Sequence, residues 1–322
     1  MSRGHILVVG GAGFIGSHVN QMLHESGYQT IVFDNLSRGF RQAVSQGVFI
    51  KGDMHDTSLL HHLFTEYKIQ AVMHFASFID VGESVTNPLK YYLNNVSGTL
   101  QLLQVMSQHE VKAFIFSSSA AVYGIPEMSY INESHPCKPI NPYGKSKLLI
   151  EDILHDIEIA HGIRSCSLRY FNAAGGDPKG CIKNYRQQES NLIPKILRHI
   201  QKAKAVKIYG TNYPTPDGTC IRDYIHVADL GSAHITAMEQ LIQGGPSTIY
   251  NLGNGKGFSV KEVLATAGQI TGKKIEVLED ARRAGDPPIL VADSAKAKQF
   301  LNWKPQYPAL EKIIADAWKA MQ

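Results

Sequence analysis

The sequence predicts a doubly wound α/β fold, in which helices cover both faces of a parallel β-sheet, with a smaller second lobe. Short continuous apolar runs alternate with longer stretches whose apolar residues recur at helical spacing. Continuous apolar runs are typical of strands buried on both faces, as in parallel sheets. From about residue 173, Gly, Pro and charged residues become frequent. We therefore expect a sheet domain and a discontinuous C-terminal substrate lobe.

Seven apolar runs have the length of strands, and the expected strands are 6–9, 30–33, 48–50, 71–75, 114–116, 167–170 and 249–252. Helical spacing joins two further sets of apolar residues, which are Phe14, Val19, Met22 and Leu23, and Leu93, Val96, Leu100, Leu103 and Val105. Because the seventh run lies far along the chain, we expect the sheet domain to comprise 1–172 plus about 222–252. The substrate lobe then comprises about 173–221 and 253–322.

Charge, cysteine content and the length of the apolar runs exclude several classes of protein. The net charge of +4 is spread along the chain, whereas nucleic-acid-binding proteins usually carry a clustered basic stripe. The four cysteines form no Cys-x-x-Cys pair, so we expect neither a disulfide framework nor a metal site. No apolar run approaches about 20 residues, and the N-terminal run is too short for a signal peptide. We expect no nucleic-acid partner, no membrane partner and a cytoplasmic location.

A glycine-rich turn follows the first predicted strand and opens a helix. Gly10, Gly13 and Gly16 have the Gly-x-x-Gly-x-x-Gly spacing of a dinucleotide-binding turn. The three glycines permit a tight turn, close approach of the backbone to a pyrophosphate, and close packing of helix on strand. The pyrophosphate is expected at the helix N-terminus, beside Phe14 and Ile15, where free N–H groups favour negative charge. The sheet domain is thus predicted to be a Rossmann domain.

An acidic residue ends the second predicted strand. Asp34 lies 18 residues after Gly16, close to the spacing of the carboxylate that binds the adenosine ribose hydroxyls. A carboxylate there would repel a 2′-phosphate, which favours NAD, with Asn35 and Ser37 as further contacts. Arg38 keeps NADP open as an alternative, because an arginine is what a 2′-phosphate requires.

Two further strand ends complete the predicted cofactor pocket. Asp53, followed by Met54, closes the third predicted strand, and Phe75-Ala76 closes the fourth. The carboxyl ends of parallel strands meet at one edge of the sheet, where ligands bind in this architecture. We expect these residues to line the adenine and ribose pocket.

A tyrosine and a lysine lie four residues apart at the start of another predicted helix. Asn141 can cap this helix and Pro142 can begin it, which puts Tyr143 and Lys147 on one face. A nearby ammonium and an oxidised nicotinamide would both stabilise the tyrosine phenolate, so Tyr143 is the predicted general base. Lys147 is predicted to lower the pKa of Tyr143 and to bind the nicotinamide ribose. Ser119, at the end of the fifth predicted strand, is predicted to hydrogen-bond the same substrate oxygen.

With these motifs, the chain resembles the extended short-chain dehydrogenase/reductase superfamily and, within it, the UDP-glucose 4-epimerase family. The resemblance covers nearly the whole chain, through motifs at 74–76, 81–85, 91–96, 117–124, 168–172, 213–219, 221–227 and 282–286. It implies NAD contacts by Asn94, Ser117 and Tyr170. It also implies that the UDP part of the substrate is held by Asn172, Asn191, Leu192, Tyr209, Arg222, Arg283 and Asp286. Guanidinium groups suit a pyrophosphate, and the Asp286 carboxylate suits a ribose hydroxyl.

The resemblance further implies a reaction. Tyr143 would take the proton of the sugar C4 hydroxyl while NAD accepts the hydride, and the 4-keto sugar would turn over before hydride return inverts C4. The implied substrate is a UDP-hexose, and the implied assembly is a homodimer through helices near 90–108 and 143–160. The apolar positions of these helices could equally belong to the core.

Three departures from the family pattern leave alternatives open. Ile79 stands where some members carry a lysine, and residues 180–190 lack the usual Gly-Glu pair and histidine. Leu290 matches a position where tyrosine excludes N-acetylated sugars and a small residue admits them. Leucine is intermediate in size, so acceptance of UDP-N-acetylglucosamine stays open.

Competing functions are a nucleotide-sugar 4,6-dehydratase or decarboxylase, and a catalytically silent NAD-binding regulatory protein. Ala120-Ala121 after Ser119 argues against a dehydratase, which needs an acidic pair there.

Overall fold

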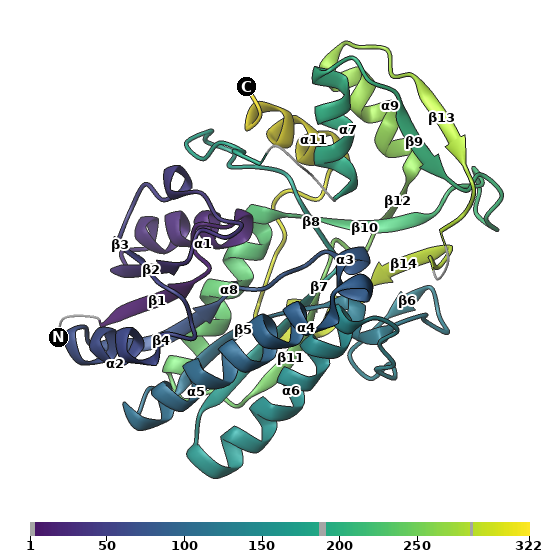
Figure 1. Ribbon diagram of the computed structural model, residues 1–322. Helices are drawn as coiled ribbons and strands as arrows, with labels where there is room; N and C mark the ends of the chain where they lie inside the picture. The colour runs from purple at the N-terminus through teal and green to yellow at the C-terminus, as the bar shows by residue number, and fades with distance from the viewer. Residues whose placement is uncertain (1–3, 187–190, 284–285) are drawn as a thin grey trace. The chain divides into compact units, whose positions relative to one another are not determined.

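The computed structural model describes residues 4–186, 191–283 and 286–322 of the chain (Figure 1). The chain forms two compact units, each built from discontinuous segments. Unit 1 comprises Met1–Gly124, Cys137–Arg169 and Gly231–Tyr250. Unit 2 comprises Ile125–Pro136, Tyr170–Leu230 and Asn251–Gln322.

The strands are β1 His5–Val9, β2 Thr30–Asp34, β3 Val48–Lys51, β4 Ile69–His74, β5 Ala113–Ser119, β6 Tyr130–Ile131, β7 Arg164–Tyr170, β8 Asn172–Ala174, β9 Val206–Tyr209, β10 Ile221–His226, β11 Thr248–Leu252, β12 Gly257–Ser259, β13 Val277–Asp280 and β14 Ile289–Ala292. The α-helices are α1 Phe14–Glu25, α2 Thr57–Glu66, α3 Val81–Thr86, α4 Pro88–Tyr91, α5 Gly98–Gln108, α6 Pro142–His161, α7 Leu192–Gln201, α8 Val227–Ile242, α9 Val260–Thr271, α10 Ala295–Phe300 and α11 Leu310–Lys319. A π-helical segment, Tyr92–Ser97, joins α4 to α5.

A seven-stranded sheet forms the centre of unit 1, in the order β11-β7-β5-β4-β1-β2-β3. β1 pairs in parallel with β2 and β4, and the parallel pairing continues to β3 on one side and β5 on the other. Each of the seven runs predicted from the sequence supplies one strand of this sheet. The strand order changes direction at β1 and β4, so the carboxyl ends of these strands lie at the switch point where ligands bind in such sheets.

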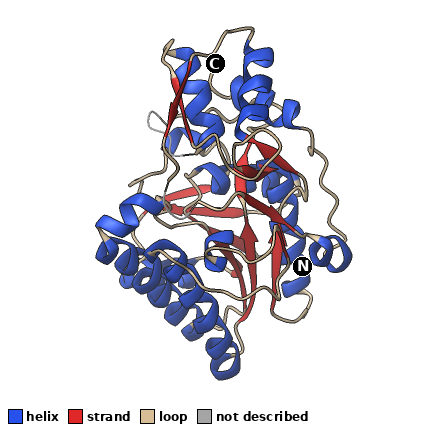
Figure 2. Cartoon of the chain, turned by 90° about the vertical axis from the view of Figure 1, so that its right-hand side faces the viewer, coloured by secondary structure: helices blue, strands red, loops and turns tan. Residues whose placement is uncertain are grey.

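Helices cover both faces of this sheet, as the doubly wound prediction requires (Figure 1; Figure 2). On one face, α2, α5 and α6 pack against β1, β2, β4 and β5 around Leu7, Phe114, Leu103 and Ile150, each at most 1% exposed. On the other face, Gly231 of α8 fits against Met22 of α1. Burial on both faces explains why most of the strands read as continuous apolar runs.

One strand departs from that expectation. β3 is one of the two edge strands of the sheet, and Val48 on it is 42% exposed. An edge strand has a neighbour on one side alone, so its apolar side chains receive less cover. A short apolar run therefore identified the strand without showing its position in the sheet.

Unit 2 contains a mixed sheet and a small helical layer. β10 pairs antiparallel with β12 and in parallel with β14 and β8, while β13 pairs with β9. Helices α7, α9 and α11 pack around a second apolar cluster that includes Ile196, Val263 and Ile313, all fully buried (Figure 1). This unit therefore has a core of its own.

Across 4–186, 191–283 and 286–322, no helix combines the length and apolar character needed to cross a membrane.

Candidate active site

The turn between β1 and α1 is closed by two glycines that accept no side chain. Gly10 has φ +77°, and a Cβ there would lie 2.5 Å from the backbone nitrogen of Ala76. A Cβ on Gly16 would overlap the carbonyl oxygen of Gly10. Gly13 caps α1, whose first turn contains no acidic residue. Since first-turn N–H groups have no partners within a helix, this turn fits a pyrophosphate.

Asp34 is buried at the end of β2 and is held by main-chain groups. Its carboxylate accepts hydrogen bonds from the N–H groups of Ala12 at 2.9 Å and Leu36 at 2.8 Å. Burial raises the pKa of Asp34, and these two hydrogen bonds oppose that rise. Leu36 adopts φ 62°, a conformation that few non-glycine residues adopt. Each carboxylate oxygen keeps a second lone pair, so Asp34 can also accept from ribose hydroxyls.

Arg38 pairs with a carboxylate, which bears on the NADP alternative. Its guanidinium lies 3.3 Å from Glu83 and stacks over the ring of Phe78. A side chain paired in this way is less available to a 2′-phosphate.

The structure brings the ends of β2 and β3 together. Asn35 donates to the Asp53 carboxylate at 2.7 Å, and the N–H of Ser37 donates to Asn35. Burial would raise the pKa of Asp53, but hydrogen bonds from His55 and Asn35 outweigh it and lower the pKa. Met54 beside it is 5% exposed. The predicted strand end was too late, because β3 stops at Lys51 and Asp53 lies in the loop beyond it.

Phe75 and Ala76 also lie just beyond a strand, since β4 ends at His74. The predicted end of the fourth strand was thus one residue too late. The N–H of Phe75 donates to the carbonyl of Val9 at 2.7 Å. This contact, with the close approach of Ala76 to Gly10, places both residues beside the glycine turn.

The start of α6 follows the capping chemistry read from the sequence. The Asn141 side chain accepts from the N–H of Gly144 at 2.8 Å, and Pro142 occupies the first turn. Tyr143 and Lys147 then lie one turn apart, 8% and 2% exposed. The predicted cap and helix start are confirmed.

Lys147 is fixed by two neutral oxygens. Its Nζ donates to Ser77 Oγ and to the carbonyl of Ser117, both at 2.7 Å. Burial lowers the pKa of Lys147 to about 7, against the opposing charge of Glu151. An ammonium has three N–H donors, so a third remains for a ligand.

Tyr143 is hydrogen-bonded to Ser119, the residue predicted from the sequence to bind the same substrate oxygen. Burial raises the pKa of Tyr143, and the hydrogen bond with Ser119 opposes the rise. The Nζ of Lys147 lies 5.9 Å from the centre of the Tyr143 ring. The sequence predicted that Lys147 lowers the pKa of Tyr143. In this structure the pKa of Tyr143 is set by burial and by the Ser119 hydrogen bond, and Lys147 does not contribute.

Asn94 lies in the π-helical segment, a rare conformation that is frequent at functional sites. Its side chain donates to Asn95 at 2.9 Å. Asn95 in turn exchanges hydrogen bonds with the main chain of Phe78 and donates to Ser146 at 3.2 Å. Sequence reasoning missed Asn95, although the Asn94-Asn95 pair marked the position.

In unit 2, the structure brings Arg222, Asp286 and Leu290 together. Arg222 pairs in register with Leu290 on the adjacent strand β14. Its guanidinium lies 3.4 Å from Asp286 and donates to the carbonyl of Pro287 at 2.8 Å. Leu290, which the resemblance links to sugar selectivity, therefore lies beside Arg222, which the resemblance links to the diphosphate.

A second predicted pair also meets. The guanidinium of Arg283 stacks over the Tyr209 ring at 3.9 Å from its centre. Asn172 donates to the carbonyl of Asp223 at 2.8 Å, one residue from Arg222 along β10. Residues 284–285, inside the Arg-Arg-Ala-Gly-Asp motif, lie outside the described residues.

The remaining predicted contacts are dispersed. Tyr170 is buried at the end of β7, while Asn191 and Leu192 begin α7. Of the divergent segment 180–190, residues 187–190 lie outside the described part of the chain.

The family model described as "NAD dependent epimerase/dehydratase family" matches residues 6–253. The chain belongs to the NAD dependent epimerase/dehydratase family. The resemblance stated from the motifs is thereby confirmed.

Relatives of this family cover the chain almost completely. The UDP-glucose 4-epimerase of Halalkalibacterium halodurans is 50% identical over 97% of this chain and 94% of its own. The structure of UDP-glucose 4-epimerase from Brucella ovis in complex with NAD has a TM-score of 0.96 at 45% identity, covering 98% of each chain. The structure from Bifidobacterium longum in complex with NAD+ and UDP has a TM-score of 0.92 at 38% identity, covering 98% of this chain and 97% of that one.

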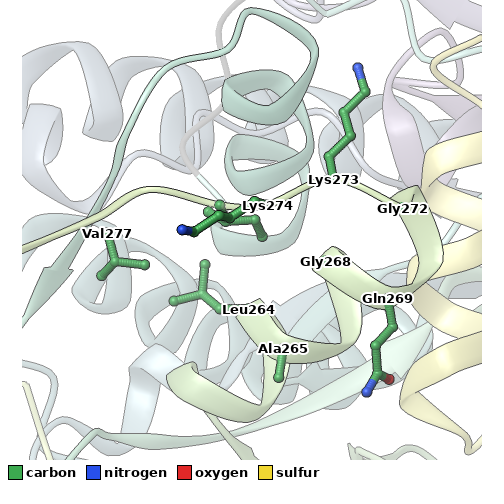
Figure 3. A pocket seen from close by; sticks show the side chains of 9 residues that line it. Leu264, Ala265, Gly268, Gln269, Gly272, Lys273, Lys274 and Val277 are labelled. Carbon is green, nitrogen blue, oxygen red and sulfur yellow. The ribbon is translucent and has the colours of Figure 1, made fainter.

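An open hollow in unit 2 lies apart from the residues predicted from the family motifs. It has a volume of about 540 Å³ and forms around the end of α9 and residues 272–277, where Leu264 and Val277 face each other (Figure 3). None of the site residues predicted from the sequence lines it.

Proposed function

We propose that this chain is a UDP-hexose 4-epimerase that works with tightly bound NAD. The observation that carries the proposal is the joint placement of Ser119, Tyr143 and Lys147 at the end of β5 and the start of α6. Full-length relatives at 44–50% identity are named UDP-glucose 4-epimerases. The substrate class is a UDP-hexose, with UDP-glucose and UDP-galactose as the exchanged pair.

The residues around the glycine turn fit NAD. The pyrophosphate would lie at the N-terminus of α1, against Gly13, Phe14 and Ile15, and Asp34 would accept the ribose hydroxyls. Residues from the loops after β2, β3 and β4, from the π-helical segment and from strands β5 and β7 complete the set, which is Asn35, Ser37, Asp53, Met54, Phe75, Ala76, Asn94, Ser117 and Tyr170. When bound, NAD supplies a reversible hydride acceptor for C4 of the sugar.

Tyr143 is proposed to hold and move the proton of the sugar C4 hydroxyl. Its burial opposes ionisation, so a phenolate requires compensating positive charge and hydrogen bonds. Ser119 provides one hydrogen bond, and an oxidised nicotinamide would supply the positive charge, while Lys147 would bind the nicotinamide ribose. The proton goes to Tyr143 as the 4-keto sugar forms, and it returns from Tyr143 to the same C4 oxygen when the ketone is reduced from its opposite face.

Unit 2 is proposed to anchor the UDP. Arg222 and Arg283 would bind the diphosphate, because guanidinium groups form charge-assisted hydrogen bonds with phosphate oxygens. Asp286 would accept from a ribose hydroxyl, and Asn172, Asn191, Leu192 and Tyr209 complete the predicted set. A firmly anchored nucleotide leaves the sugar free to present either face.

One competing reaction, the elimination of water by a dehydratase, requires groups that this chain lacks at the matching positions. Elimination of water needs an acidic pair after the active-site hydroxyl, and Ala120 and Ala121 stand there in the structure. A silent NAD-binding protein has no chemical need for the hydrogen bond between Ser119 and Tyr143.

The test is incubation of the purified protein with UDP-glucose and no added nucleotide, followed by NMR of the sugar protons. We expect UDP-galactose to appear until the two sugars reach equilibrium. A dehydrated product would instead indicate a 4,6-dehydratase. No product, even with NAD added, would favour the silent binder.

We also propose a homodimer formed through α5 and α6, which pack on the same face of the sheet. Exposed apolar side chains on these helices and on the π-helical segment before α5 include Leu93, Leu100, Leu149 and Ile159, which are 60%, 40%, 43% and 74% exposed. Exposed apolar residues gathered on neighbouring helices favour an interface. Light scattering should give twice the chain mass of 35.5 kDa. Leu93→Glu with Leu100→Glu should give a monomer, whereas Ile242→Glu on α8 should not.

A further inference from the structure

A buried carboxylate lies one helical turn beyond Lys147. Glu151 is on α6, and its side chain is 3% exposed. It accepts a hydrogen bond from Ser118 Oγ at 2.5 Å and pairs with Arg169, whose Nε lies 3.0 Å away. The proton-transfer scheme above uses none of these three side chains.

Arg169, the partner of Glu151, also contacts a third buried side chain, that of Tyr123. Arg169, on β7, donates to the hydroxyl of Tyr123 at 3.0 Å, and its guanidinium lies over the Tyr123 ring. Buried ion pairs often stabilise a fold no better than apolar residues of the same volume. The position of Glu151 therefore invites an explanation beyond stability.

Three successive residues of β5 are each tied to α6. The Ser117 carbonyl accepts from Lys147, Ser118 donates to Glu151, and Ser119 is hydrogen-bonded to Tyr143. The ties are spaced one helical turn apart along α6, at residues 143, 147 and 151. Glu151 thus holds the middle serine, and the serines on either side contact the residues assigned to the reaction.

Glu151 also balances charge. The hydrogen-bond partners of Lys147 are neutral oxygens, so the adjacent carboxylate supplies the negative charge that favours its protonated form. On β4, His74 is kept neutral, because burial foremost and the charge of Lys147 lower its pKa to about 3. The other groups around the cluster are Tyr143 and Asp152 on α6, Arg169 on β7, and Cys137.

We propose that Glu151 is a positioning residue for the reaction, anchoring the Ser117–Ser119 strand end to α6 through Ser118 and serving as the counter-ion of Lys147. The inference rests on the proposed epimerase function for its effect on turnover. Its effect on Lys147 is independent of any substrate.

The first test follows the charge of Lys147 directly. The protein as purified would be labelled with ¹³C at lysine Cε, and the Lys147 resonance would be assigned by its loss in Lys147→Arg. In Glu151→Gln, we expect its titration midpoint to fall by at least one pH unit, a tenfold fall in the ratio of protonated to neutral Lys147 at a given pH. Asp152→Asn removes the same charge from an exposed position of α6 and should leave the midpoint within 0.3 units. An unchanged midpoint in folded Glu151→Gln would overturn the proposal.

The second test removes the anchor and keeps the ion pair. Ser118→Ala should lower kcat at least fivefold, with KM for the UDP-sugar and the Lys147 midpoint unchanged. If Glu151→Gln does not fold, this variant decides, and full kcat in Ser118→Ala would overturn the proposal. The wild-type assay with UDP-glucose tests the epimerase function by itself, so the two failures remain distinguishable.

Discussion

The proposed proton-transfer residues and the proposed UDP anchors are built in contrasting ways. Tyr143 and Lys147 in unit 1 are almost fully buried, and their polar atoms meet oxygens of β5 and of the loop after β4. In unit 2, Arg283 is exposed, and the Asp286 side chain is 34% exposed. The first set is fixed before a ligand arrives, whereas Arg283 and Asp286 keep donors and acceptors open to solvent. Arg222, whose side chain is 13% exposed, lies between these extremes.

The difference follows from what each set must do. A proton-transfer group needs a fixed position and a charge state set by its surroundings, and burial provides both. An anchor must exchange its water for ligand, which exposed charged groups do readily. Substitutions should therefore change rate and charge state in unit 1, and affinity in unit 2.

The largest expected effect tests the unit 1 side of this comparison. Tyr143→Phe should lower epimerisation about a thousandfold, because general acid–base groups typically contribute 10²- to 10⁴-fold. Affinity for UDP, measured by calorimetry, should not change. Tyr130→Phe, at an exposed tyrosine of β6, is the control and should keep full activity. Turnover above a tenth of wild type in Tyr143→Phe would contradict the base assignment.

The next effect concerns the buried ammonium. Lys147 has a pKa of about 7 in the folded protein, whereas the ordinary value for lysine is 10.5. Between pH 7 and pH 10.5 the unfolded chain therefore binds more protons than the folded protein. The free energy of unfolding should rise with pH over this range. From pH 7 to 9 this contribution is on the order of 2–3 kcal/mol. Urea unfolding should show Lys147→Met losing that rise, while exposed Lys145→Met keeps it. Parallel pH profiles for wild type and Lys147→Met would show that burial does not shift this group.

A smaller effect is expected at the UDP anchor. Arg222→Met should weaken UDP binding about 10- to 100-fold, since hydrogen bonds to charged groups contribute about 1.5–3 kcal/mol. The rate constant kcat should change less than affinity. Arg282→Met, which removes an exposed guanidinium that donates to Asn212, serves as the control. An equal loss in both variants would mean that general positive charge, not Arg222 itself, attracts the diphosphate.

The smallest effect concerns sugar selectivity. Leu290→Ala, next to Arg222, should raise kcat/KM for UDP-N-acetylglucosamine relative to UDP-glucose by about three- to tenfold, within what pocket size alone achieves. The ratio can be measured by NMR in mixed-substrate reactions. Leu278→Ala on β13 should leave the ratio unchanged. No change in Leu290→Ala would place the selectivity elsewhere.

Local patterns predicted much of this architecture. Apolar runs located the seven strands, and the Asn141-Pro142 pair marked the start of α6. Strand ends were less accurate, because a strand stops where its hydrogen-bonded neighbour stops, as β3 does at Lys51. The apolar positions Leu93 and Leu100 could have been core or surface, and the structure places both at the surface.

The sequence by itself determined the family, the glycine turn and the one-turn spacing of Tyr143 and Lys147, because these depend on residues near one another along the chain. Only the tertiary structure decided that Ser77 and the Ser117 carbonyl hold Lys147, that Glu83 pairs with Arg38, and that Glu151 lies between Ser118 and Arg169. Those contacts join residues from separate elements, and the charge of a buried group depends on every element packed around it.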